Sequence, residues 1–283
     1  MRILVTGAKG QLGFDTLKEL SRRKYTDILG IDYEDLDLVD EEKTRKFVLD
    51  FKPDVIMHNA AYTAVDKAED EKEKCYDINV NGTKNLINPA KEIGAKFLFI
   101  STDYVFGGKS DEPYEIDSPK NPLSTYGSSK SLAEDLVQAY NKHFVVRTSW
   151  VYGSNGHNFV KTMLRLGKEK KELSIVSDQI GSPTYTVDLA KLLCDMIGTD
   201  SYGIYHATNE GYCSWYEFAK KIFSLTGNQI LVNPVTSEQY PTKAIRPMNS
   251  RLSKKSLTEN GFSLLPVWDN ALERYLKEIG EII

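Results

Sequence analysis

Short apolar runs alternate with longer amphipathic stretches over the first 147 residues. Runs that are nearly continuous in apolar residues predict strands at 3–5, 28–31, 55–58, 97–100 and 144–146. Helical periodicity lies between them, at 11–23, 41–51, 72–93 and 125–140. We expect Pro89 to kink or interrupt the third helix. Apolar strands alternating with helices are typical of a parallel sheet covered on both faces. The pattern predicts an α/β fold, a Rossmann-type doubly wound parallel sheet.

A glycine-rich turn lies between the first predicted strand and the first predicted helix. It places Gly7, Gly10 and Gly13 at three-residue spacing. In such a turn the first glycine permits the tight bend, the second admits a pyrophosphate, and the third allows close helix packing. The free N–H groups at the helix N-terminus then favour the anion. The turn therefore predicts a dinucleotide site.

An acidic residue follows this turn at the distance that a dinucleotide site requires. Asp32 ends the second strand, 19 residues after Gly13. A carboxylate there accepts from the ribose hydroxyls and repels a 2′-phosphate, and no arginine follows to hold that phosphate. We therefore expect NADH in preference to NADPH. The cofactor-binding residues that we expect are Gly7, Gly10, Gln11, Leu12, Gly13, Asp32, Asp37, Leu38, Ala60, Ala61, Tyr62, Tyr126 and Lys130.

A tyrosine and a lysine stand one helical turn apart in the fourth predicted helix. Tyr126 and Lys130 have the i, i+4 spacing that places both on one helix face. Reducing a carbonyl needs a proton donor, and a nearby ammonium is expected to lower the pKa of a tyrosine toward neutrality. Thr102 follows the fourth strand at the sheet edge where such folds bind ligands. Together with the glycine turn, these residues predict hydride chemistry at a carbonyl group.

The alternation of apolar strands and amphipathic helices ends after residue 147, where Gly, Pro, Asn and Ser become frequent. A helix at 186–197 and a strand at 203–206 fit as additions to the sheet, and an amphipathic helix at 269–279 fits a smaller region. We therefore expect a dinucleotide-binding Rossmann domain and a smaller mixed α/β substrate-binding region. The domain would comprise residues 1–149 and 180–208, and the region 150–179 and 209–283.

Composition and charge narrow the function classes further. The net charge of −4 comes with no basic region of the kind that binds nucleic acid, and no apolar run is long enough for a membrane span. Cys75, Cys194 and Cys213 are far apart and in no metal-binding spacing, and we expect no signal peptide. These features predict a reduced, cytoplasmic protein without a metal site.

Several stretches resemble a known family, the extended short-chain dehydrogenase/reductases, and within it the dTDP-4-dehydrorhamnose reductases. The resemblance covers nearly the whole chain. The stretches that carry it are 10–13, 61–69, 101–106, 147–153, 178–184 and 246–250. The resemblance implies that Thr102, Tyr126 and Lys130 are catalytic and that Asp103 and Trp150 border the sugar. It also implies that Ser182, Thr184 and Arg246 lie near the nucleotide diphosphate, for which an arginine fork is suited.

The function implied by the resemblance is reduction of dTDP-4-dehydro-L-rhamnose at C4 by NAD(P)H, in cell-surface polysaccharide synthesis. Two alternatives remain open: another nucleotide-linked keto sugar, or a non-catalytic NAD(P)-binding regulatory subunit, because a fold does not fix a function. The partners we expect are the nucleotide-sugar substrate and a second copy in a homodimer, with no nucleic acid and no membrane. Some relatives hold a divalent metal at a dimer contact, and Asp15 and Asp188 fall at comparable positions, but we predict no metal site.

Overall fold

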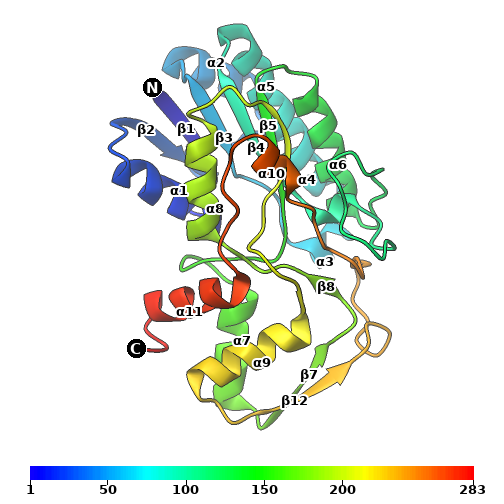
Figure 1. Ribbon diagram of the computed structural model, residues 1–283. Coiled ribbons are helices and arrows are strands. Elements are labelled where there is room, and N and C mark those ends of the chain that lie inside the picture. Colours follow the sequence, from blue (N-terminus) through cyan, green and yellow to red (C-terminus); the bar gives the residue numbers. More distant parts are fainter.

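A computed structural model describes all residues from 1 to 283 and contains one large parallel sheet. The six strands lie in the order β10-β5-β4-β3-β1-β2, and every neighbouring pair is parallel (Figure 1). The predicted doubly wound sheet is therefore confirmed, with 203–206 added as an edge strand. The strand bounds are β1 Arg2–Thr6, β2 Asp27–Ile31, β3 Val55–His58, β4 Lys96–Thr102, β5 His143–Thr148 and β10 Gly203–His206.

Helices cover both faces of this sheet because the strands are apolar on both sides. On one face α1 (Gln11–Arg22) and α8 (Thr186–Met196) pack over side chains such as Ile3 and Val5. On the other face α2 (Glu41–Phe51), α5 (Gly82–Ile93) and α6 (Thr125–Gln138) pack over Leu4 and Ile56. The alternation of successive strand residues between faces thus produces two separate cores.

The predicted helix at 72–93 is divided, although not at its proline. It forms α4 (Lys72–Tyr76), a π-helical turn at Asp77–Asn81 and then α5. α5 continues through Pro89, so the predicted interruption at that residue is wrong. Wide π-helical turns often occur at functional sites. Here the turn directs Asn79 toward the loop after β3, where its side chain accepts from Tyr62 N (2.8 Å).

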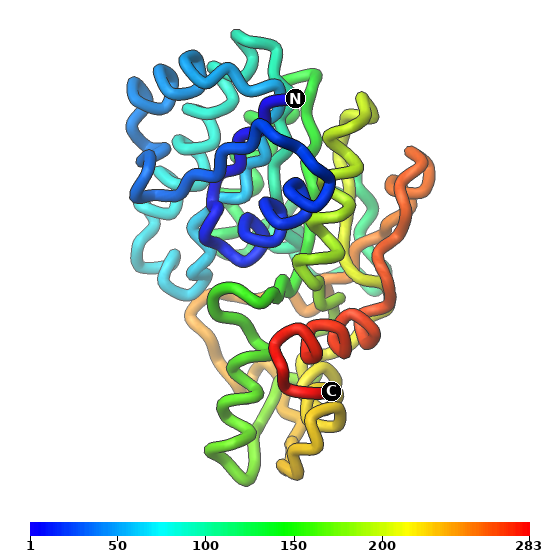
Figure 2. The backbone as a smooth tube through the Cα atoms, turned by 90° about the vertical axis from the view of Figure 1, so that its left-hand side faces the viewer, coloured from blue at the N-terminus to red at the C-terminus, as the bar shows by residue number.

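A smaller lobe lies beyond the carboxyl edge of the sheet and has its own core. Figure 2 shows this lobe below the sheet, with the C-terminal helix across it. Its core packs aromatic and aliphatic side chains from α7 (Phe159–Glu169), α9 (Trp215–Thr226) and α11 (Trp268–Glu278). The prediction that the C-terminal helix packs on the small region is confirmed. Its paired strands are β6 Val151–Tyr152 with β9 Thr184–Tyr185, β7 Glu172–Val176 with β12 Leu231–Val235, and β8 Ile180–Gly181 with β11 Cys213–Ser214.

One segment of the C-terminal part returns to the sheet. α10 (Lys255–Glu259) contributes Leu257 to the core beneath α1 and α8, together with Phe262 and Leu265. Its apolar side chains therefore join the larger domain rather than the small lobe, where the sequence boundaries placed them. The two remaining short helical segments are α3 (Val65–Ala68) and a 3₁₀ turn at Asp103–Val105. None of the helices is both long and apolar enough to cross a membrane.

Candidate active site

A cavity of about 960 Å³ opens at the carboxyl ends of the sheet strands. Parallel α/β sheets bind their ligands at this edge, because the loops and helix N-termini converge there. The lining comes from the glycine-rich turn, the loops after β2, β3 and β4, the start of α6 and the segment after β5. The cavity is large enough for an extended dinucleotide and part of a second ligand.

The glycine-rich turn has the shape that a diphosphate cradle needs. Gly7 has a φ of +67°, and a Cβ there would lie 2.8 Å from Ala60 N. A Cβ on Gly13 would lie only 2.0 Å from the carbonyl oxygen of Gly7. α1 begins at Gln11 without a side-chain cap, so its first N–H groups have no partner within the helix. The turn therefore leaves free donors and a positive dipole end facing the cavity.

Asp32 lies beside this turn and is fixed by backbone donors. Its Oδ2 accepts from Lys9 N (2.8 Å), and its Oδ1 accepts from Tyr33 N (2.9 Å). Lys9 Nζ lies 3.0 Å from Glu34 Oε2, and both of these side chains are largely exposed. The carboxylate expected to bind a ribose is thus in place, and a cation that the sequence reasoning overlooked lies next to it.

Most of the other predicted cofactor residues line the same cavity. Gly7, Gly10, Gln11, Leu12, Gly13, Asp32, Asp37, Leu38, Ala60, Ala61, Tyr126 and Lys130 are all in its lining. Tyr62 is not: its hydroxyl donates to Glu71 Oε2 (2.9 Å) at the surface. The raised pKa of Tyr62, about 12, follows from burial of the ring and from this carboxylate.

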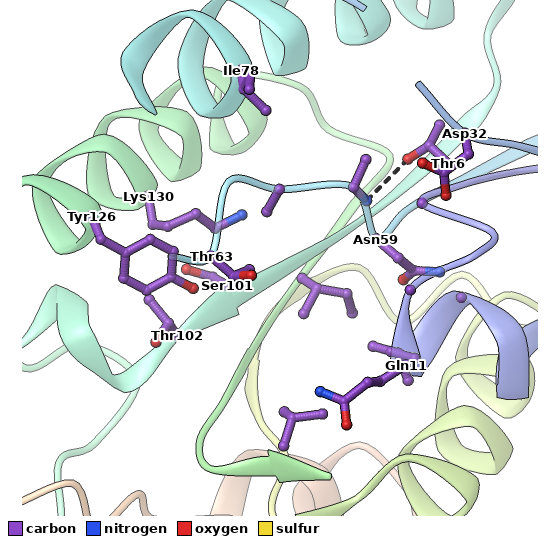
Figure 3. A pocket seen from close by; sticks show the side chains of 18 of the residues that line it. Thr6, Gln11, Asp32, Asn59, Thr63, Ile78, Ser101, Thr102, Tyr126 and Lys130 are labelled. Atoms are coloured by element: carbon purple, nitrogen blue, oxygen red, sulfur yellow. Dashed lines mark hydrogen bonds between the residues drawn. The ribbon is translucent and has the colours of Figure 1, made fainter. Parts of the chain in front are cut away.

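Thr102, Tyr126 and Lys130 come together at one end of the cavity (Figure 3). Ser124 caps the start of α6 by accepting from Gly127 N (3.1 Å). Glu69 accepts from both the backbone N–H and the hydroxyl of Thr125, at 2.8 and 2.9 Å. These two anchors hold the first turn of α6, so Tyr126 is presented to the cavity by a fixed helix end.

Burial governs the ionisation of both α6 groups. It lowers the pKa of Lys130 to about 7, and Lys130 Nζ lies 3.9 Å from the centroid of the Phe99 ring. It also raises the pKa of Tyr126, and the nearby Asp103 carboxyl adds to this rise. The expectation of a lowered tyrosine pKa is wrong for this structure, because burial disfavours the charged phenolate. At neutral pH, Tyr126 is therefore a protonated donor.

A buried carboxyl lies next to Thr102. Asp103 Oδ1 accepts from Thr102 Oγ1 (2.9 Å), and Oδ2 accepts from Ser250 Oγ. Burial raises the pKa of Asp103 to about 6, although the two hydroxyl groups oppose this. Asp103 lines the cavity, and its place beside the sugar stays a prediction.

The other predicted substrate residues are not all in one place. Trp150 lines the cavity, has a φ of +49° and stacks on Trp215 at 3.7 Å between centroids. Ser182 and Thr184 are buried outside the lining, and Ser182 Oγ donates to the Gly211 carbonyl (2.7 Å). Arg246 is also outside the lining and pairs with both oxygens of Asp66, at 3.2 and 2.7 Å.

Three further polar residues line the cavity and have unpaired atoms; the sequence reasoning placed only Asn59 beside the cofactor. Asn59, Ser101 and Thr148 are in the lining, and buried polar atoms of each have no hydrogen-bond partner in the protein. Buried polar atoms are normally paired, so unpaired ones facing a cavity indicate a bound polar ligand. Ser101 and Thr148 are near the ends of β4 and β5, and Asn59 directly follows β3. Polar residues at strand ends were the available signal. With the glycine cradle, these atoms fit a bound dinucleotide.

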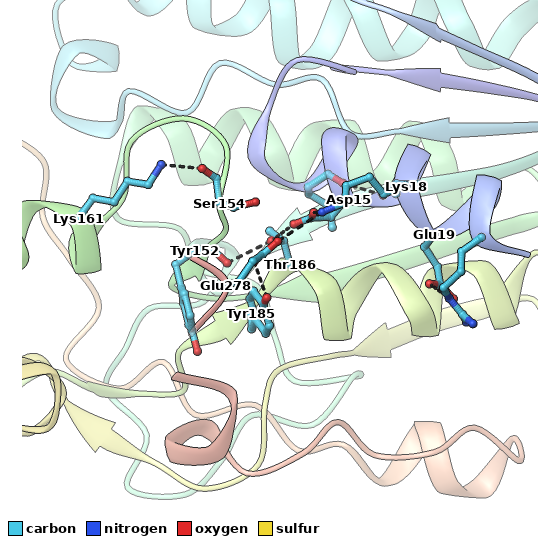
Figure 4. A network of polar contacts seen from close by, with 12 residues as sticks. Asp15, Lys18, Glu19, Tyr152, Ser154, Lys161, Tyr185, Thr186 and Glu278 are labelled. Carbon is cyan, nitrogen blue, oxygen red and sulfur yellow. Dashed lines mark hydrogen bonds and ion pairs between the residues drawn. The ribbon is translucent and has the colours of Figure 1, made fainter. Parts of the chain in front are cut away.

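The acidic positions compared with a metal site are paired within this chain. Asp15 accepts from Thr186 Oγ1 and lies 3.8 Å from Lys18 Nζ (Figure 4). Asp188 pairs with Arg274, which donates to both of its oxygens. The structure contains no group of three or more His, Cys, Asp or Glu side chains arranged to hold a metal ion. Cations of the chain itself occupy the places beside these carboxylates.

Known proteins resemble this chain over nearly its full length. It is 42% identical to the spore coat polysaccharide biosynthesis protein SpsK of Bacillus subtilis, with 98% of this chain and 97% of that protein covered. It is 41% identical to dTDP-4-dehydrorhamnose reductase of Aggregatibacter actinomycetemcomitans, with 96% of this chain and 97% of that protein covered. The crystal structure of dTDP-4-dehydrorhamnose reductase from Bacillus anthracis in complex with NADP matches with a TM-score of 0.95 and 45% identity, covering 98% and 99%.

The family model for the RmlD substrate binding domain matches residues 1–281. The match spans the glycine cradle, the Thr102, Tyr126 and Lys130 group and the small lobe, so it is not confined to one motif. With these full-length relatives beside it, the chain belongs to the RmlD substrate binding domain family.

Proposed function

We propose that this protein reduces the C4 keto group of dTDP-4-dehydro-L-rhamnose to give dTDP-L-rhamnose, with NAD(P)H as the reductant. The observation that carries the proposal is the cavity that joins a dinucleotide cradle to Thr102, Tyr126 and Lys130. The relatives named as dTDP-4-dehydrorhamnose reductases support the choice of sugar. A regulatory subunit would not require these three side chains to face one cavity.

When bound, NAD(P)H supplies the hydride that adds to C4. Tyr126, protonated at neutral pH because of burial, donates its phenolic proton to the C4 oxygen as that oxygen gains charge. Lys130 lies one turn further along α6; its ammonium stabilises the phenolate that forms. Its pKa of about 7 lets it exchange protons readily at that pH. The Thr102 hydroxyl, which donates to Asp103 in the structure, would donate to a substrate oxygen instead.

Substrate binding is assigned to Asp103, Trp150, Ser182, Thr184 and Arg246. Asp103 would accept from a sugar hydroxyl, and the stacked Trp150 would pack on the sugar. Ser182 and Thr184 would act indirectly, by fixing the position of their loop, since neither lines the cavity. Arg246 could reach a diphosphate only by leaving Asp66, which holds it in a fork-like pair.

The cofactor preference is a finer proposal than the use of NAD(P)H. Asp32 supports NADH, because a fixed carboxylate beside the ribose repels a 2′-phosphate. The B. anthracis relative was crystallised with NADP, however, and gives the NADH preference no support. Lys9 offers a physical route to NADPH. Its exposed ion pair with Glu34 is worth little, so the ammonium can turn to a 2′-phosphate at small cost.

The test is loss of reduced-nicotinamide absorbance on adding dTDP-4-dehydro-L-rhamnose, with NADH and NADPH run in parallel. Tyr126→Phe should abolish turnover but keep cofactor binding, whereas Tyr202→Phe, remote from the cavity lining, should leave turnover unchanged. Cofactor binding without oxidation by this sugar would point to another keto sugar or to a regulatory role. The homodimer and the cytoplasmic location stay predictions, as does the division of the chain into two domains.

A further inference from the structure

The loop 153–158 lies against the glycine-rich turn, although about 145 residues separate them in the chain. It connects β6 to α7 in the small lobe. Gln11 Oε1 accepts from Gly153 N and from Asn158 Nδ2, both at 3.0 Å. Asn155 Nδ2 donates to the carbonyl of Lys9. The loop is thus tied to the two residues that flank Gly10 in the proposed diphosphate cradle.

The same loop is braced from behind. Lys161 Nζ donates to the carbonyls of Ser154 (2.7 Å) and Gly156 (2.9 Å), and the first of these contacts is drawn in Figure 4. Tyr275 donates to the Gly153 carbonyl at 3.1 Å. Gly156 has a φ of +70°, which lets the chain turn there. The ammonium of Lys161 and the hydroxyl of Tyr275 thus fix the carbonyls of the loop to the small lobe.

His157 is the one ionisable side chain of this loop, and it has no polar partner within the protein. It is exposed, makes no hydrogen bond or ion pair with the protein, and lines the cavity together with Lys9, Gly10 and Gln11. An imidazole at this position can donate an N–H to an anionic oxygen. The cradle's free helix N–H groups show that the anionic part of the dinucleotide belongs at the same turn.

We propose that His157 is a cofactor contact, which reaches the dinucleotide diphosphate from the small lobe, opposite the glycine-rich turn. Gln11 and Asn155 are the positioning residues that hold the loop at the cradle. The small lobe would thereby help to bind the cofactor as well as the sugar, and cofactor binding would draw the two lobes together. This inference rests on the proposed dinucleotide site but not on the identity of the sugar.

The experiment is a charge series at His157, measured by calorimetric titration with ADP-ribose and with NADH, in the absence of any sugar. ADP-ribose retains the diphosphate and lacks the nicotinamide, so its binding reports on the diphosphate side of the site without contributions from the nicotinamide ring. His157→Ala should weaken ADP-ribose binding about threefold, in the range for an exposed charged contact. His157→Glu should weaken it about tenfold, and His157→Lys should keep or tighten it. Lys171→Ala, an exposed cation outside the lining, is the matched control and should change nothing.

The order of the series separates a charged contact from a structural role. If His157 only shaped the loop, the Lys, Ala and Glu variants would all weaken binding by similar factors, with lower melting temperatures. That result, or unchanged affinity in the Glu variant, overturns the proposal. Wild-type protein that binds ADP-ribose but does not oxidise NADH with the sugar would refute the proposed function and leave this inference standing.

Discussion

Replacing Arg147 by methionine should destabilise the protein strongly, because it leaves a buried carboxylate unpaired. Arg147 in β5 donates to both oxygens of Glu134 in α6, at 2.9 and 2.8 Å, and the two side chains are 2% and 0% exposed. It also donates to the Ile116 carbonyl (2.9 Å) and lies 3.2 Å from His206 Nε2. Breaking such a buried pair from one side typically costs about 3–5 kcal/mol.

Partial compensation places the expected loss at the lower end of this range. Lys120 Nζ lies 3.7 Å from Glu134 and remains as a cation beside it. We expect a loss of about 3 kcal/mol, which lowers the melting temperature by about 5 °C in a protein of this size. Because α6 also carries Tyr126 and Lys130, loosening of this helix should reduce turnover already at temperatures below the melting temperature of the wild type.

The assay is thermal unfolding of Arg147→Met, Glu134→Leu and the double variant. The double variant removes both charges and should regain more than half of the loss, since apolar pairs often replace buried ion pairs without cost. Lys120 then keeps Asp135 and the Ser131 carbonyl as partners. A melting temperature within about 2 °C of the wild type for Arg147→Met, or strictly additive losses in the double variant, would refute the reasoning.

Three further predictions concern the cavity. Gly13→Ala should abolish NADH binding in a fluorescence titration, because its Cβ would collide with the Gly7 carbonyl, whereas the remote Gly198→Ala should bind normally. Lys9→Glu should weaken NADPH binding more than NADH binding, and equal losses for the two cofactors would contradict a role at the 2′-phosphate. Lys130→Met should raise the melting temperature of the cofactor-free protein at pH 6. The pKa of Lys130 falls from 10.5 to about 7 on folding, so its destabilising effect is complete below pH 7 and fades as pH rises toward 10.5. The difference from the wild type should therefore shrink by pH 9, and a constant difference would speak against the lowered pKa.

Local patterns predicted the sheet well, because each core strand is short, apolar and flanked by turn residues. The glycine turn and Asp32 were also recognisable, since their spacing reflects contacts within one βαβ unit. What the sequence could not supply was the meeting of distant segments. Asn59, Ser101 and Thr148 meet only because parallel strands end at one edge. The direction of the Tyr126 pKa shift depends on how deeply α6 is buried, and no spacing along the chain reports that.

The two lobes have different tasks at the proposed site, and their contacts suggest how these tasks are linked. The sheet domain holds the cradle and the α6 donor rigidly, through Glu69 at the helix start and Arg147 at its buried face. The small lobe meets the cradle through Gln11, whose single carbonyl oxygen accepts from two groups of the loop 153–158. A dinucleotide that fills the space between turn and loop would press on both partners of this contact. Cofactor binding would then bear on the position of β6 and of Trp150 just before it, which links the proposed dinucleotide site to the proposed sugar site.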